Sequence, residues 1–177
     1  WGQDFRPSYL KIVDFIKRLP KRPVVSAFTA TATAEVRDDI IDILMLQEPE
    51  VLTTGFDRTN LYFGVQTPKD RYQALVELLE QHKSESGIVY CLTRKIVEEV
   101  CEKLIKEGFS VTRYHAGLSD AERKHNQEEF IYDNVRIMVA TNAFGMGIDK
   151  SNVRWVIHYN LPKSIESFYQ EIGRAGR

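Results

Sequence analysis

The sequence lacks long apolar runs, an excess of charge of either sign, and a set of cysteines large enough to build a disulfide framework. No stretch of 18 apolar residues occurs among its 177 positions, so no membrane-spanning helix and no membrane partner are predicted. The sequence has 24 Lys and Arg residues and 25 Asp and Glu residues, which give a formal net charge of -1. Any binding of nucleic acid must therefore depend on a local surface rather than on an overall basic field.

The start of the chain carries neither a signal peptide nor an initiator Met. The expectation is an excerpt of a protein that is cytoplasmic, associated with the nucleoid in a bacterium, or nuclear in a eukaryote. The two cysteines are Cys91, inside an apolar run, and Cys101, on the apolar side of a helical pattern. This placement predicts buried, reduced thiols and no metal site.

What the chain does have is a regular alternation of helical and extended patterns. Helices are expected where apolar residues recur at helical spacing, over residues 8–19, around Val36, Ile40 and Leu44, and over 69–83, 95–107, 119–132 and 164–173. Strands are expected in the β-branched runs 24–28, 87–92, 109–115, 135–140 and 153–159. Such alternation predicts an α/β fold, with an open parallel sheet and helices on both of its faces.

Residues 51–65 interrupt this alternation with two short extended pieces separated by the polar "DRTN". That pattern is typical of a crossover between two domains. We expect a boundary near Arg58 to Asn60, with one domain over 1–58 and a second over 59–177.

The loops that follow the predicted strands are the places to look for chemistry, because ligands bind outside the carboxyl ends of the strands in an open parallel sheet. All of these loops are polar, small or charged. They read "SAFTATAT", "CLTRK", "YHAGLS", "ATNAFGMGID" and "NLPKS". Backbone N–H groups and hydroxyls in loops that lead into helices are well suited to hold phosphates.

Taken in order, these segments resemble the motifs of superfamily 2 helicases, in particular the RecQ family of DNA helicases. The resemblance rests on "WGQDFRPSY" (aromatic-rich loop), "SAFTATAT" (motif III), "GIVYCLTRK" (motif IV), "YHAGL", "ATNAFGMGIDKSNVRWVIH" (motif V) and "QEIGRAGR" (motif VI). It implies a RecA-like fold of the P-loop NTPase type. Residues 1–58 would end the first RecA-like domain, and 59–177 would form most of the second.

For motif VI, the resemblance implies that Arg174 and Arg177 are the catalytic arginines, which meet the γ-phosphate of ATP. Their spacing of three lets both point the same way on a helical turn, and guanidinium groups are matched to phosphoryl oxygens. Taken alone, "GRAGR" reads equally well as a helix end with a glycine cap and arginines that compensate the dipole. The other nucleotide contacts implied by the resemblance are Gly147, Asp149 and Gln170.

The resemblance also implies a set of contacts with single-stranded DNA. These residues are Trp1, Phe5, Arg6, Thr93, Arg94, His115, Thr141 and Asn142. Aromatic and cationic side chains in polar loops suit stacking on unpaired bases and binding of the backbone. The alternatives are packing of the aromatic loop on the following helix, a solvated helix start at Thr93, and a plain turn residue at His115. The sequence departs from the family at Gln3, where His is usual.

The phosphate-loop pattern GxxxxGK[ST] and a DExH stretch are absent from these 177 residues, so the chain alone is not expected to hydrolyse ATP. The resemblance implies that the parent protein is an ATP-dependent 3′–5′ DNA helicase acting on single-stranded and forked DNA. Its ATP and Mg²⁺ would be bound mainly by residues outside this chain, and zinc only by a downstream domain.

Two other functions stay open at this stage. One is an RNA helicase domain of the same superfamily, and the other is a non-catalytic module that binds nucleic acid or a protein partner. A dinucleotide-binding dehydrogenase is disfavoured, because no GxGxxG follows any predicted strand.

Overall fold

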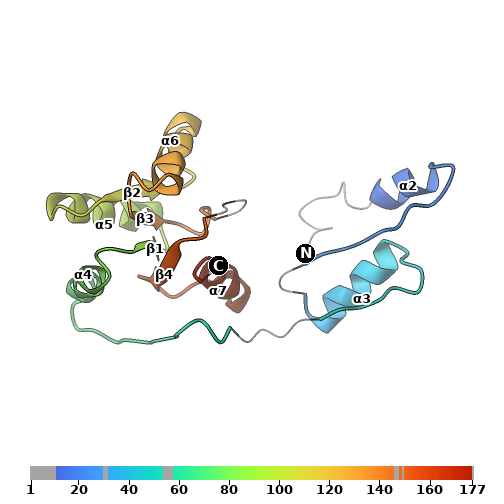
Figure 1. Cartoon of the computed structure of the whole chain (residues 1–177), viewed down its shortest axis with the longest axis horizontal. Coiled ribbons are helices and arrows are strands. Elements are labelled where there is room, and N and C mark those ends of the chain that lie inside the picture. Colours follow the sequence, from blue (N-terminus) through green and yellow to red (C-terminus); the bar gives the residue numbers. More distant parts are fainter. Residues whose placement is uncertain (1–10, 30–31, 54–57, 146–147, 149, 177) are drawn as a thin grey trace. The chain divides into compact units, whose positions relative to one another are not determined.

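The structure is a computed structural model that describes residues 11–29, 32–53, 58–145, 148 and 150–176. The chain divides into two compact units, Trp1–Asp57 and Arg58–Arg177 (Figure 1). Assignment of the first unit to the end of one RecA-like domain stays a prediction.

The first unit contains two short helices, α2 (Lys11–Lys17) and α3 (Ala34–Ile43). Both lie within the stretches predicted to be helical. The Thr33 side chain caps α3 by accepting a hydrogen bond from the backbone N of Val36 at 3.3 Å. Arg22 binds the backbone that follows the C-terminal end of α3, because its Nη2 donates to the carbonyl of Met45 at 2.8 Å.

The strand predicted at residues 24–28 does not form, and that prediction is wrong. Val24 is 97% exposed and Phe28 is 94% exposed. A β-branched run favours extended backbone, but a strand also needs a partner for its ladder of hydrogen bonds. The described residues of this unit contain no strand that could supply one.

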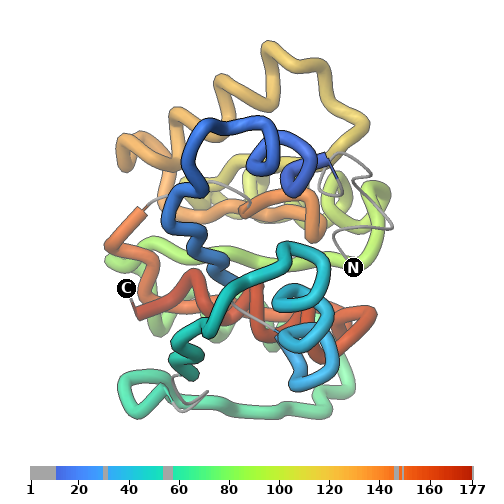
Figure 2. The backbone as a smooth tube through the Cα atoms, turned by 90° about the vertical axis from the view of Figure 1, so that its right-hand side faces the viewer, coloured from blue at the N-terminus to red at the C-terminus, as the bar shows by residue number. Residues whose placement is uncertain are grey.

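The second unit is built on four parallel strands in the order β2-β3-β1-β4. The strands are β1 (Ser86–Tyr90), β2 (Val111–Tyr114), β3 (Ile137–Ala140) and β4 (Val153–His158). The helices are α4 (Arg71–Gln81), α5 (Arg94–Lys106), α6 (Asp120–Ile131) and α7 (Ile165–Ile172). Figure 2 follows this backbone from the green α4 to the red α7.

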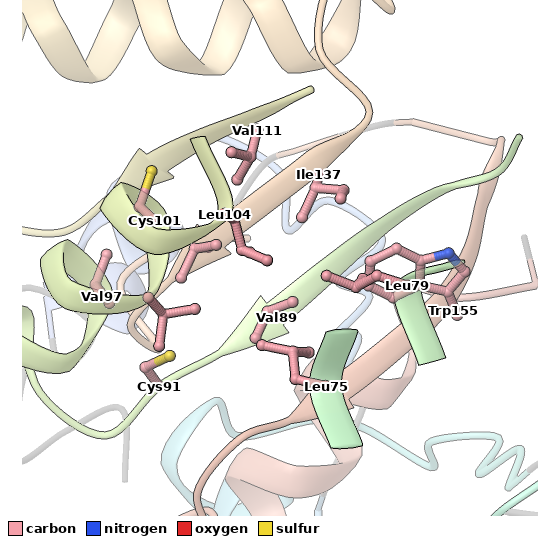
Figure 3. Close-up of a cluster of buried hydrophobic side chains, with 12 residues drawn as sticks. Leu75, Leu79, Val89, Cys91, Val97, Cys101, Leu104, Val111, Ile137 and Trp155 are labelled. Atoms are coloured by element: carbon pink, nitrogen blue, oxygen red, sulfur yellow. The ribbon is translucent and has the colours of Figure 1, made fainter. Parts of the chain in front are cut away.

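Side chains of β1 alternate between two apolar clusters, one on each face of the sheet. Val89 points into a cluster formed with α4 and α5, which includes Leu79 and Leu104 (Figure 3). Tyr90 points into the opposite cluster, which includes Phe130 of α6. Helices therefore cover both faces, and the predicted α/β fold with an open parallel sheet is confirmed.

Helix starts in this unit follow ordinary capping chemistry. Asp70, Thr93, Ser119 and Ser164 each accept a backbone N–H of the first turn. The predicted capping box is confirmed at Ser119, because Glu122 also bonds back to the backbone N of Ser119 at 3.1 Å.

Trp155 packs directly on Gly87 of the neighbouring strand. A Cβ atom built on Gly87 would lie 2.1 Å from the indole ring, so only glycine leaves room for it. The strand register shifts between Ser86 and Gly87, and the Trp155 side chain is only 9% exposed. The indole therefore fills the space where a side chain on β1 would otherwise stand.

Both cysteines are buried and unpaired, as predicted. Burial raises the pKa of Cys91 to about 12 and that of Cys101 to about 11. Among the described residues, no cluster of His, Cys, Asp or Glu side chains is placed to hold a metal ion. None of the described helices has the length and apolar character that crossing a bilayer requires.

Candidate functional site

The carboxyl ends of β1, β3 and β4 meet at one edge of the sheet, where ligands of such folds bind. A hollow at this edge is lined by Leu92 after β1, Asn142 after β3, and Asn160 and Lys163 after β4. Asn160 ties two of these loops together, since its Oδ1 accepts from the backbone N of Leu92 at 3.2 Å. Three of the loops predicted to carry chemistry, those after β1, β3 and β4, therefore lie side by side.

Arg174, one of the two predicted catalytic arginines, packs against Gly145 in the loop after β3. A Cβ atom built on Gly145 would lie 3.0 Å from Nε and 3.1 Å from Cζ of Arg174. Gly145 also has a φ of +124°, which disfavours any other residue there. The structure thus joins the motif V and motif VI segments.

The positive charge of Arg174 has no close carboxylate within the described ranges of the chain. The side chain is half-buried, and its Nε atom is buried with no hydrogen-bond acceptor in the described structure. A buried donor without a partner is costly, on the order of 1–3 kcal/mol. This geometry is unusual for an arginine that serves only to hold the fold together.

Tyr90 lies beside this guanidinium at the end of β1. Its hydroxyl donates to the carbonyl of Phe144 at 3.1 Å. Burial raises the pKa of Tyr90 well above its usual value, while the charge of Arg174 acts in the opposite direction. Tyr90 therefore stays neutral and holds the start of the loop that Arg174 touches.

The turn that carries Arg174 is held by two residues at the beginning of the second unit, Arg58 and Asn60. Arg58 Nη2 donates to the carbonyls of Ala175 at 3.2 Å and of Gly176 at 3.1 Å. Asn60 Nδ2 donates to the carbonyl of Gly176 at 2.7 Å. Sequence reasoning missed Arg58 and Asn60 as site residues and used them only to mark a boundary.

A second feature missed from the sequence is the pairing of His158 with Glu171 of α7, Nε2 to Oε2 at 2.7 Å. The His158 ring stacks on Tyr90 with centroids 5.8 Å apart and lies 5.3 Å from the ring of Phe168. These contacts fix α7, and with it motif VI, against β4. Glu171 stands within "QEIGRAGR", which was the one signal available from the sequence.

Two predicted DNA contacts, Thr93 and Arg94, are exposed at the start of α5. The Thr93 hydroxyl caps the helix by accepting from the backbone N of Ile96 at 3.2 Å. Arg94 lies over the turn after β2, since its Nη1 atom would be 3.2 Å from a Cβ built on Gly117. Motif IV and the "YHAGL" turn are therefore adjacent.

His115, the third predicted DNA contact in this region, is buried and both of its ring nitrogens are occupied. Nε2 lies 2.6 Å from Glu98 Oε1, and Nδ1 accepts from the backbone N of Gly117 at 3.1 Å. Arg113 shares the same carboxylate at 2.8 Å. The observed role of His115 is to hold the turn, and its contact with DNA stays a prediction.

The remaining described candidates are two residues that follow β3, Thr141 and Asn142, and one residue of α7, Gln170. Thr141 is buried and its backbone N donates to the carbonyl of Tyr114 at 3.1 Å. Asn142 is exposed in the hollow, and Gln170 is exposed on α7. Six predicted site residues lie outside the described residues: Trp1, Phe5, Arg6, Gly147, Asp149 and Arg177.

Comparisons with known proteins agree with this arrangement. The helicase conserved C-terminal domain matches residues 70–177. The ATP-dependent DNA helicase RecQ of Bacillus subtilis is 48% identical over 177 residues, which is 100% of this chain and 30% of that protein. The RecQ-like DNA helicase BLM of Xenopus laevis is 44% identical over 181 residues, covering 100% of this chain and 13% of that protein. The chain thus spans less than a third of either relative.

Among solved structures, S. cerevisiae Dbp5 bound to RNA and ADP BeF3 superposes with a TM-score of 0.75. The match covers 94% of this chain and 45% of that one at 24% identity, which shows a shared fold. The RecA-like architecture inferred from the sequence is thereby confirmed. This chain belongs to the family of helicase conserved C-terminal domains, and its resemblance to the RecQ helicases is confirmed.

Proposed function

We propose that this chain is the part of a RecQ-type, ATP-dependent DNA helicase that supplies arginines for ATP hydrolysis and contacts for single-stranded DNA. The full-length protein would unwind duplex and forked DNA in the 3′ to 5′ direction, in replication, recombination and repair. The observation that carries the proposal is the half-buried Arg174 guanidinium, which has no carboxylate close by among the described residues and lies on Gly145. The names of the relatives support the same activity.

The residues present suit the polyphosphate of ATP. Glycine at position 145 removes the side chain that would otherwise cover the guanidinium, and Nε of Arg174 lacks an acceptor. A guanidinium with no carboxylate close by among the described residues, and with one donor without an acceptor there, is complementary to phosphoryl oxygens. ATP, when bound, supplies the anhydride bond whose hydrolysis drives movement, with Mg²⁺ bound mainly by residues outside this chain.

Within this proposal each group of residues has a distinct task. Arg177 and Arg174 stabilise negative charge that develops on the transferred phosphoryl group. Gly147, Asp149 and Gln170 contact the nucleotide. The loops at the sheet edge and the aromatic-rich segment bind single-stranded DNA through Trp1, Phe5, Arg6, Thr93, Arg94, His115, Thr141 and Asn142.

The test is Arg177→Ala in the full-length protein, measured as ATP hydrolysis stimulated by single-stranded DNA. We expect the rate to fall by roughly 10³ to 10⁵, the range typical of an arginine finger, while DNA affinity is retained. Arg136→Ala is the control, because Arg136 is an arginine placed just before β3, at the end of the strands opposite the candidate site, where it donates to the carbonyl of Lys83 at 3.0 Å. Near-normal hydrolysis by Arg177→Ala would overturn the proposal.

Competition between DNA and RNA separates the proposal from an RNA helicase. Single-stranded DNA and RNA of the same sequence are each titrated into the full-length protein, and ATP hydrolysis is followed. We expect DNA to stimulate and RNA to compete poorly. Stimulation by RNA alone would favour the RNA helicase, and no stimulation by either would favour a non-catalytic module.

A further inference from the structure

We infer that Arg58 and Asn60 are positioning residues for the motif VI arginines. They hold the backbone of residues 175–176 and so fix the direction in which the chain leaves Arg174 and enters Arg177. This inference rests on the function proposed above and adds two residues that stand 116 to 118 positions before the peptide they bind.

The contacts are made with two successive backbone carbonyls, those of Ala175 and Gly176. The Gly176 carbonyl accepts from both Arg58 at 3.1 Å and Asn60 at 2.7 Å. The same Arg58 nitrogen also reaches the Ala175 carbonyl at 3.2 Å. A charged donor makes stronger hydrogen bonds than a neutral one, and two different side chains on one oxygen restrict its orientation. The peptide that leads into Arg177 is therefore held from one side.

Backbone hydrogen bonds hold the same turn from the other side. Gly176 N donates to the carbonyl of Val153, the first residue of β4, at 3.1 Å, and Arg174 N donates to the carbonyl of Glu171 at 3.2 Å. The turn is thus fixed to the sheet through the N–H of Gly176, to α7 through the N–H of Arg174, and to residues 58–60 through its carbonyls. Without the hydrogen bonds from Arg58 and Asn60, the turn would stay attached through its N–H groups but would be free to rotate.

The glycine at position 176 shows how close the two segments lie. A Cβ atom there would lie 2.6 Å from Asn60 Nδ2 and 2.8 Å from Leu61 Cδ2. The φ of Gly176 is +67°, which is unfavourable for other residues. The glycine between the two arginines is therefore favoured by its own backbone conformation and by the side chains of Asn60 and Leu61 that lie against it.

Positioning of this kind matters because catalysis by a guanidinium depends on its direction and distance, and a displacement of about 1 Å can cost roughly 10²-fold in rate. Arg58 and Asn60 touch only backbone within motif VI, and Arg58 Nε also donates to Asn60 Oδ1 at 3.4 Å. Their loss should therefore change the geometry of the arginines without removing a charge from the nucleotide. The expected signature is a lower kcat for ATP hydrolysis with little change in KM for ATP.

The experiment measures DNA-stimulated ATP hydrolysis by the full-length protein carrying Arg58→Ala, Arg58→Lys or Asn60→Ala, together with the melting temperature of each variant. For Arg58→Ala we expect kcat to fall about tenfold to a hundredfold while KM for ATP stays within about twofold. Arg58→Lys should recover part of the loss, because one ammonium nitrogen can still donate to the two carbonyls but lysine has no second nitrogen for Asn60 Oδ1. Asn60→Ala removes one donor and should show a smaller loss of the same kind.

Arg136→Ala is again the control, and it should leave kcat unchanged. The inference is overturned if folded Arg58→Ala keeps the kcat of the wild type, or if Arg136→Ala loses as much. If Arg58→Ala does not fold, Asn60→Ala decides by the same criteria. Loss of kcat in Arg177→Ala but not in the position 58 and 60 variants would overturn only the positioning role. Normal turnover by Arg177→Ala would instead overturn the proposed function.

Discussion

The Nε2 atom of His158 lies 2.7 Å from the Oε2 atom of Glu171, and this pair joins the last strand of the sheet to α7. The two side chains are 14% and 9% exposed, so each is largely removed from water. A buried polar group needs its partner, because desolvation is otherwise uncompensated. The pair therefore holds the helix that leads into motif VI.

A double-mutant cycle tests this pair. His158→Ala, Glu171→Ala and the double variant are unfolded in urea, and the interaction energy is taken from the four free energies of unfolding. We expect about 1–3 kcal/mol, the range for residues in one buried polar network. The control cycle is His82 with Glu85, whose atoms lie 2.9 Å apart but whose side chains are 42% and 41% exposed. There we expect about 0–1 kcal/mol, and equal values for the two cycles would contradict the argument.

Acid should weaken the contact around Asp133. Hydrogen bonds from Lys150 and Asn152 lower the pKa of Asp133 below its usual 3.8. The unfolded chain therefore binds a proton at a higher pH than the folded chain does, and the contribution to stability is lost as the pH falls below 3.8 through the lower folded value. Urea unfolding of the wild type and Asp133→Asn between pH 7 and pH 3 measures this. The difference in stability between them should shrink in that acid window, and a constant difference would refute it.

The two thiols should react slowly in the native protein. At pH 8 a thiol with a pKa of about 12 is ionised roughly a thousandfold less than an ordinary one, and for a pKa of about 11 the factor is roughly a hundredfold. Alkylation by iodoacetamide, followed by mass spectrometry, should label Cys101 before Cys91 and both only slowly. In denaturant both should react at the ordinary rate. Fast labelling of either thiol in the native state would show that it is accessible.

Gly145→Ala should damage both stability and activity. Its φ of +124° adds backbone strain of about 1–3 kcal/mol, and the new methyl group would press on the Arg174 guanidinium. Gly108→Ala is the matched control, because its φ is +84° and nothing lies within 4 Å of an added Cβ. We expect both variants to unfold at lower urea concentrations, and only Gly145→Ala to lose DNA-stimulated ATP hydrolysis in the full-length protein. Equal activity in the two would show that the contact with Arg174 is unimportant.

The elements of the second unit could be predicted because each carries its own local signal. The apolar spacing of α5, with buried Val97, Val100, Cys101 and Leu104, is that of a helix packed on a sheet. The Ser119 capping box likewise lies within four residues. The run 24–28 has an equally clear local signal, but a strand is completed only by a partner, which local sequence cannot guarantee.

Residues of the candidate site could be predicted only where they belong to a recognisable sequence motif. Arg174 was singled out from "GRAGR", whereas the donors that hold its turn are more than 115 positions away, and no periodicity links them. His115 shows a second limit of prediction from the sequence, because its partners in the fold could not be foreseen. The family resemblance implied a DNA contact, whereas the residue type alone was compatible with a plain turn residue, and in the structure a carboxylate on α5 binds the ring. Partners that are distant in sequence decide which polar residues remain available.

The contact of Trp155 with Gly87 provides an optical probe. The sequence holds only two tryptophans, Trp1 and Trp155, and the second is enclosed by the sheet of the second unit. Replacing Trp1 by phenylalanine would leave a single tryptophan in these 177 residues, and its emission would report whether β1 and β4 remain paired. Separation of that strand pair during unfolding of this chain could then be followed in real time without an added dye.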